Sequence, residues 1–209
     1  MRRAIVFLLL AAALIRPSLA RAQNADRHLL DRLDPATAEE VWKIAESARA
    51  QGVPYESLLL TAAEGASKHA PPERIIVAVR ERYTALSVAK EALGAESTPG
   101  EISAGAGALM SGVSADTLAR LRQMRPKGSL LVSLVVLADL VTRRVPVETA
   151  STALLHASRM GAKDEDLLRL RSRVESDIKK GVSPAAATIS RLQGLGVNPP
   201  PTPPRSGPR

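Results

Sequence analysis

Apolar residues recur along most of this chain at the spacing of an α-helix. The first such stretch begins at Asp34, a residue suited to cap a helix, and continues with Pro35, which favours the first helical position. It ends at Gly52, and its apolar face holds Val41, Ile44, Ala45 and Ala48. This pattern predicts a helix between Asp34 and Gly52.

The same signals predict the other helices. Their expected starts are Pro54, Pro71 or Pro72, Pro99, Ser114, the stretch 129–144, Pro146, Asp164 and Ser183–Pro184. No useful length of sequence alternates apolar and polar residues as a half-buried strand would. We therefore expect an all-α protein of about nine helices joined by tight glycine and proline corners, either an irregular helical repeat or an orthogonal bundle.

Three of the breaks between helices share the spacing A-x3-G-x5-L. Their glycines are Gly52, Gly112 and Gly161, each preceded by an alanine four residues earlier and followed by a leucine six residues later. Glycine permits the left-handed backbone that ends a helix, and the small alanine lets the next helix cross closely. Helix-turn-helix DNA readers use a related corner but need one recognition helix, so three corners favour helix packing over DNA binding.

A looser duplication relates residues 53–75 to residues 145–167. The two segments align without gaps at an offset of 92 residues, and both begin with the same valine and proline. A unit of three helices and two corners is therefore expected twice, as in helical-repeat proteins, although the spacing fits no named repeat.

The N-terminus has the pattern of a secretory signal peptide. Arg2 and Arg3 precede twelve apolar residues at 4–15, and small residues follow at Ala20 and Ala22. Because a membrane-spanning helix needs about 20 apolar residues, this run is too short for an anchor. We expect residues 1–22 to be cleaved and the mature protein to be exported, either to the periplasm or out of the cell.

The mature chain is expected to form one folded body with loose ends. We predict a flexible lead at residues 23–33, a single all-helical domain at 34–196 and a disordered proline-rich tail at 197–209. The tail segment 200–205 fits the form of a polyproline ligand, but a solvated tether is the favoured interpretation.

Charge excludes some partners. The 29 basic and 21 acidic residues give a net charge of +8, but residues 1–22 hold four arginines and no acid, which leaves +4 after cleavage. Acids and bases mix along most helices, as on a salt-bridged surface, and form no basic face of the kind that binds nucleic acid. We expect no nucleic-acid partner, and no membrane contact after cleavage. Because the chain has no cysteine, disulfides and thiolate metal sites are excluded.

Asp139 is the acid that most invites a catalytic interpretation, because it lies in the most apolar stretch of the mature chain, residues 129–144. However, Ser129, Ser133, Asp139 and Arg143 share an arc of about 120° on a helix. Arg143 also follows Asp139 by four residues, within reach of an ion pair. We expect Asp139 to be structural.

No residue pattern predicts an active site. The histidines are His28, His69 and His156, and none has a metal-binding spacing. The chain lacks G-x-S-x-G and an S-x-x-K beside a plausible base, and the glycines of 103–112 lack the G-K-[ST] of a phosphate loop. We therefore predict no catalytic, cofactor-binding or metal-binding residue, and no cofactor.

Two classes of function stay open. The first is a non-enzymatic exported helical protein that acts as a protein-interaction or structural module of the cell envelope, with another protein as its partner. The alternative is a hydrolase-type enzyme with an unrecognised site of Asp, Glu and Arg. The scarcity of histidine, aromatic residues and reactive motifs favours the first class.

Overall fold

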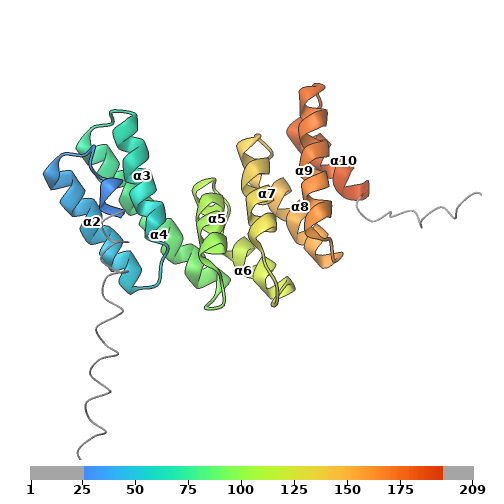
Figure 1. The fold of residues 1–209 in the computed structure, drawn as a ribbon. Coiled ribbons are helices and arrows are strands. Elements are labelled where there is room, and N and C mark those ends of the chain that lie inside the picture. Colours follow the sequence, from blue (N-terminus) through green and yellow to red (C-terminus); the bar gives the residue numbers. More distant parts are fainter. Residues whose placement is uncertain (1–25, 195–209) are drawn as a thin grey trace, which may run out of the picture. The chain divides into compact units, whose positions relative to one another are not determined.

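The computed structural model describes residues 26–194 of the chain. Over these residues the protein is helical and contains no strand, which confirms the predicted all-α class (Figure 1). Its helices are α2 (Pro35–Ala50), α3 (Glu56–Ser67), α4 (Pro72–Leu93), α5 (Pro99–Met110), α6 (Ala115–Met124), α7 (Leu131–Thr142), α8 (Val147–Arg159), α9 (Asp164–Lys179) and α10 (Pro184–Gln193). The predicted signal peptide and the predicted tail lie outside the described residues.

The internal contacts of the chain divide it into two compact units, residues 1–87 and residues 88–209. The first unit contains α2, α3 and most of α4, and the second contains the end of α4 and helices α5 to α10. Helix α4 continues from one unit into the other. The single domain expected at 34–196 therefore stays a prediction.

The described part of the expected flexible lead, residues 26–33, is packed in helical turns. Leu30 is buried, and the hydroxyl of Tyr55 donates a hydrogen bond of 2.9 Å to Asp26. The guanidinium of Arg27 lies 4.6 Å from the ring centre of Trp42 on α2. Burial of Leu30 and these polar contacts hold the segment against the first unit, so this part differs from the loose lead that composition indicated.

Side chains cap the helix starts as the sequence predicts. Asp34, Ser114 and Ser183 each accept a hydrogen bond from the backbone N–H three residues later. Thr98 caps α5 in the same way, and Glu101 bonds back to the N–H of Thr98 to complete a capping box. These caps satisfy N–H groups that have no partner within their own helix.

The three glycine corners share one hydrogen-bonded geometry. Gly52, Gly112 and Gly161 have φ angles of +64°, +95° and +72°. In each corner the N–H after the glycine donates to the carbonyl of the alanine four residues before it, at 2.9–3.0 Å. This is a Schellman helix end, and its alanine and the leucine six residues after the glycine are fully buried. The shared motif therefore turns the chain between packed helices.

Three further corners have the same backbone hydrogen bond but different residue types. Their left-handed residues are His69, Arg144 and Gly181, and the following N–H again donates to the carbonyl five residues before it, at 3.0 Å. The residue six positions on is buried in all three corners: Ile75, Ala150 and Ala187. The A-x3-G-x5-L spacing missed them because histidine and arginine take the place of glycine in two corners, and aspartate takes the place of alanine in the third.

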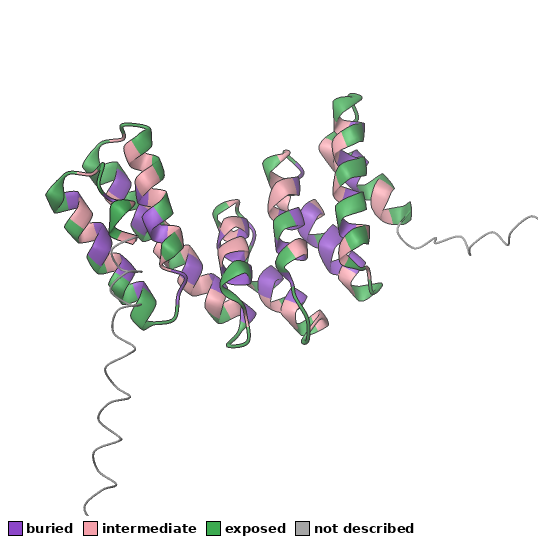
Figure 2. Cartoon of the chain, viewed as in Figure 1, coloured by how far each residue is buried: buried purple, intermediate pink, exposed green. Residues whose placement is uncertain are grey.

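The second unit stacks its helices in two layers (Figure 1). Helix α7 packs on α5 and α9, whereas α8 packs on α6 and α10. The layers meet where α7 packs on α8 and α9 packs on α10. Buried residues line the sides by which these helices meet (Figure 2). The arrangement gives the layer of α5, α7 and α9 a common outer face.

Helix α7 lies at the centre of this stack, as its apolar sequence indicates. Leu134, Val136, Leu137 and Leu140 are fully buried. Its neighbour in the layer, α5, packs closely against the end of α4 and against α6 at Gly105, which has no side chain. A Cβ atom at Gly105 would lie 3.0 Å from Leu93 and 3.1 Å from Leu118, so a larger residue there would require these side chains to shift.

Candidate interaction surfaces

The outer face of α5 and α7 is nearly free of charge. Within their bounds these helices contain one ionisable residue each, Glu101 and Asp139. Glu101 is buried, whereas Leu131 and Val135, one turn apart on α7, are 41% and 43% exposed. An exposed helix side composed of apolar and small residues is unusual for a solvated surface and indicates a contact site.

The register of α7 against its neighbours places a third apolar residue beside these two. Asp139 pairs with Arg171 of α9 at 3.0 Å, and Arg143 pairs with Glu175 at 3.1 Å, so the two helices run parallel. One turn before the Asp139–Arg171 pair lie Val135 on α7 and Leu168 on α9.

Leu168 is 44% exposed. Leu131, at the start of α7, lies next to α5. A Cβ atom at Gly100 of α5 would be 3.8 Å from the Cδ1 atom of Leu131. We call Gly100, Leu131, Val135 and Leu168 the apolar band. It crosses the layer of α5, α7 and α9.

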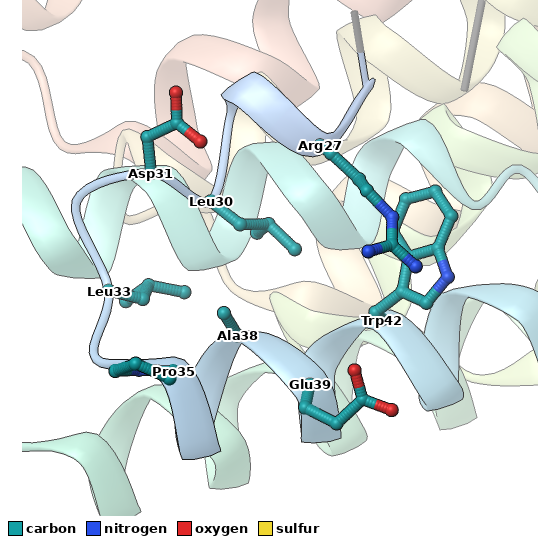
Figure 3. Close-up of a pocket in the computed structure, with 8 residues that line it drawn as sticks. All are labelled: Arg27, Leu30, Asp31, Leu33, Pro35, Ala38, Glu39 and Trp42. Atoms are coloured by element: carbon teal, nitrogen blue, oxygen red, sulfur yellow. The ribbon is translucent and has the colours of Figure 1, made fainter. Parts of the chain in front are cut away.

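A pocket of about 290 Å³ lies in the first unit (Figure 3). Its lining residues are Arg27, Leu30, Asp31, Leu33, Pro35, Ala38, Glu39 and Trp42. The Trp42 indole donates to Glu46 at 2.9 Å, and the Arg27 guanidinium stacks over the ring. Because Arg27 covers the ring face that a ligand would use, this pocket is a weak candidate for a ligand site.

A second pocket, of about 250 Å³, lies between α8 and α10. Its lining residues are Glu148, Thr149, Thr152, Ala153, Thr188, Ile189 and Leu192. Only Glu148 among them is ionisable, and no titratable pair converges on the cavity. Its small size and mostly apolar lining suit a single apolar side chain better than a reactive site.

The buried carboxylate Glu101 is fully occupied by hydrogen bonds. One oxygen accepts from Arg122 at 2.8 Å and from the Leu130 N–H at 2.7 Å, and the other accepts from the N–H and hydroxyl of Thr98 at 2.8 and 2.9 Å. Burial alone would raise the pKa of Glu101, but these bonds together outweigh burial and lower the pKa below its usual value. Glu101 therefore ties α5 to α6 and to the start of α7.

Asp139 forms the predicted ion pair with Arg143, at 2.7 Å. The contact with Arg171 and the bond from Arg143 to Glu175 were not predicted, because they come from another helix. The prediction of a polar arc is wrong at Ser133, which is fully buried. Its hydroxyl has no hydrogen-bond partner among the described residues. Ser133 lies at the edge of the arc, where the neighbouring helices cover it.

Asp177 is the other largely buried acid. It accepts two hydrogen bonds from Arg191 of α10, at 2.6 and 2.8 Å, which lower the pKa of Asp177. Asp139, Glu101 and Asp177 thus each join two helices through an arginine. The packing role of these contacts in the second unit therefore explains the positions of the three acids.

The three histidines lie in separate elements of the fold. His28 contacts Asp31 at 2.9 Å on the surface, His69 occupies a left-handed corner, and His156 is exposed on α8. No cluster of three or more residues that could hold a metal ion occurs between residues 26 and 194. None of the helices in this range combines the length and apolar character needed to cross a membrane.

The fold and its surfaces define an all-helical protein with stacked helices in its second unit. Comparisons of the chain with known protein families, with curated proteins and with solved structures gave no match.

Proposed function

We propose that this chain is an exported, non-enzymatic helical protein that acts as a protein-interaction or structural module of the cell envelope. The observation that supports this proposal is the apolar band on the outer face of α5, α7 and α9. Proteins built from stacked helices commonly bind their partners along such a face, because successive helices contribute side chains to one extended surface.

The band offers enough unburied apolar surface for a specific contact. Full burial of a leucine or valine side chain contributes about 1.5–3 kcal/mol, so covering the exposed part of Leu131, Val135 or Leu168 would contribute about 1 kcal/mol each. Gly107 on the same helix as Gly100 has open space where a Cβ atom would be. A partner backbone could therefore approach α5 closely.

Export gives this surface a setting in which the partner would be an envelope or extracellular protein. The N-terminal pattern of Arg2, Arg3 and the apolar run at 4–15 supports this part of the proposal, although those residues lie outside the described range. The three arginine-bound acids of the second unit give no support to the hydrolase alternative, because each has a packing role.

The proposal is tested by site-specific photo-crosslinking in cells that produce the full chain. A photoreactive amino acid at Val135 should yield a discrete adduct with another protein, and Val135→Asp should prevent capture by a probe placed at Leu131. The matched control is Val77 on α4, which is 52% exposed in the first unit. Equal adduct formation from positions 135 and 77, or unchanged capture in Val135→Asp, would contradict the proposal.

A further inference from the structure

After an acidic first turn, whose exposed Glu165 lies one turn before Arg169, helix α9 presents a row of cations to solvent. From residue 169 onward, its exposed cations are Arg169, Arg173, Lys179 and Lys180, the last of which directly follows the helix. Ser172 and Ser176 lie between them and are also exposed. Figure 2 colours the exposed residues of α9 green. We call these four cations the basic side of α9.

The acids of the same stretch are turned away from this side. Glu175 is directed toward α7, where it pairs with Arg143, and it also binds Lys179 at 2.7 Å. Asp177 is buried and held by Arg191 of α10. As a result, positive charge on the solvent side is only partly balanced by the helix that carries it.

Arg173 has no acidic partner among the described residues, whereas the charge of Lys180 acts on Asp177 and helps to lower the pKa of that acid. Arg169 pairs with Asp166 and Lys179 with Glu175, whereas Arg173 and Lys180 form no ion pair there. Both side chains are exposed, so the packing of the fold does not require a cation at either position. Uncompensated surface cations of this kind attract acidic groups and orient them during association.

The basic side begins where the apolar band ends. Leu168 is the last residue of the band, and Arg169 directly follows it on α9. Arg169 lies about 100° around the helix from Leu168, so a ligand that covers Val135 and Leu168 would reach Arg169 and Arg173 where it continues past Leu168 around α9.

We propose that the segment bound by the apolar band is an acidic amphipathic helix of another protein. Its apolar side would cross Leu131, Val135 and Leu168, and the carboxylates that follow beyond Leu168 would face Arg169 and Arg173 of the basic side of α9. This inference rests on the proposed function and specifies the partner's chemistry. Helices α5, α7 and α9 contain no tryptophan or tyrosine, the residues that favour a membrane interface, so a protein segment fits this face better than an anionic membrane.

The test uses three fluorescent peptides of the same length with leucines at helical spacing. Their remaining positions carry glutamate, glutamine or lysine, and binding to the full mature chain is followed by fluorescence anisotropy at low and high salt. We expect the glutamate peptide to bind at least about tenfold more tightly than the glutamine peptide at low salt, and to lose that advantage at high salt.

The charge-reversal variant Arg173→Glu/Lys180→Glu should weaken binding of the glutamate peptide about tenfold, while its thermal unfolding stays unchanged. The matched control reverses two exposed cations of the first unit, Arg32→Glu/Arg74→Glu, and should leave binding intact. Loss of binding in both variants would show a non-specific effect of net charge and would overturn the inference.

Other outcomes separate this inference from the proposed function. Equal binding of the glutamate and glutamine peptides, abolished by Val135→Asp, would overturn the acidic partner and leave the interaction surface standing. Failure of all three peptides to bind would overturn the inference, whereas the proposed function is decided separately by crosslinking at Val135. Tighter binding to phosphatidylglycerol vesicles than to the glutamate peptide, with sensitivity to Arg173→Glu/Lys180→Glu, would replace the protein segment with a membrane surface.

Discussion

Replacing Glu101 with glutamine tests how the second unit is held together. The Glu101 side chain is 2% exposed, and its two oxygens accept four hydrogen bonds from Thr98, Arg122 and Leu130. Glutamine keeps the shape of the side chain but has one acceptor oxygen, and it places an NH2 group where the other oxygen accepted. Whichever way the amide is oriented, two donors lose their acceptor.

The expected loss of stability follows from these contacts. A hydrogen bond to a charged group contributes about 1.5–3 kcal/mol, and removing one partner of a buried ion pair costs about 3–5 kcal/mol. Because Thr98 is exposed and its hydroxyl can turn to water, we expect the Glu101→Gln variant to lose about 3 kcal/mol of unfolding free energy. Its melting temperature should fall by about 10 °C.

The same residue predicts a dependence on pH. The pKa of Glu101 is lowered in the folded protein, so between its folded and unfolded pKa values the unfolded chain binds more protons. The stabilising contribution of Glu101 is therefore present above the unfolded pKa, near 4.5, and is lost as the pH falls through the folded pKa. Below pH 4.5 the stability of the wild type should decrease more steeply than that of Glu101→Gln.

Thermal and urea unfolding, followed by circular dichroism between pH 7 and pH 3, measure both effects. The control is Glu96→Gln, an exposed acid just before α5, which should change the melting temperature by no more than about 2 °C. If Glu101→Gln melts as the control does and keeps the pH dependence of the wild type, Glu101 does not hold these helices together.

Three further predictions concern the corner, the surface ion pair and the N-terminus. Gly112→Val should lower the unfolding free energy by more than 1 kcal/mol in urea titrations, because the φ angle of +95° strains a β-branched residue, whereas Gly107→Ala should add about 0.5–1 kcal/mol, since its Cβ would meet no neighbour. Asp139→Asn should cost about 1 kcal/mol in thermal melts and keep the cellular phenotype, because its partners are two arginines at a partly exposed site; a lost phenotype with an unchanged melt would favour a catalytic role. Edman sequencing of exported protein should find a start within two residues of Gln23, and an uncleaved chain in membranes would contradict export.

Local interactions are the part of this structure that the sequence predicts well. The caps at Asp34 and Ser114 and the corners at Gly52, Gly112 and Gly161 depend on residues that lie within about ten positions of one another. Hydrogen bonds of this kind form wherever the local sequence allows them, so residue type and spacing were sufficient. The breaks before Pro71 and Pro146 were predicted, but the left-handed residues in them, His69 and Arg144, were not, because there the packing of the following helix outweighs the cost of a left-handed side chain.

The tertiary structure alone decided which helix sides meet. Two of the three partners of Glu101, Arg122 and Leu130, lie 21 and 29 residues away, and Arg171 reaches Asp139 from a different helix. The apolar band likewise joins Gly100, Leu131 and Leu168, whose separation along the chain hides their proximity. Helical periodicity defines the apolar side of each helix, but the rotation and register of one helix against another depend on the fit of all their side chains at once.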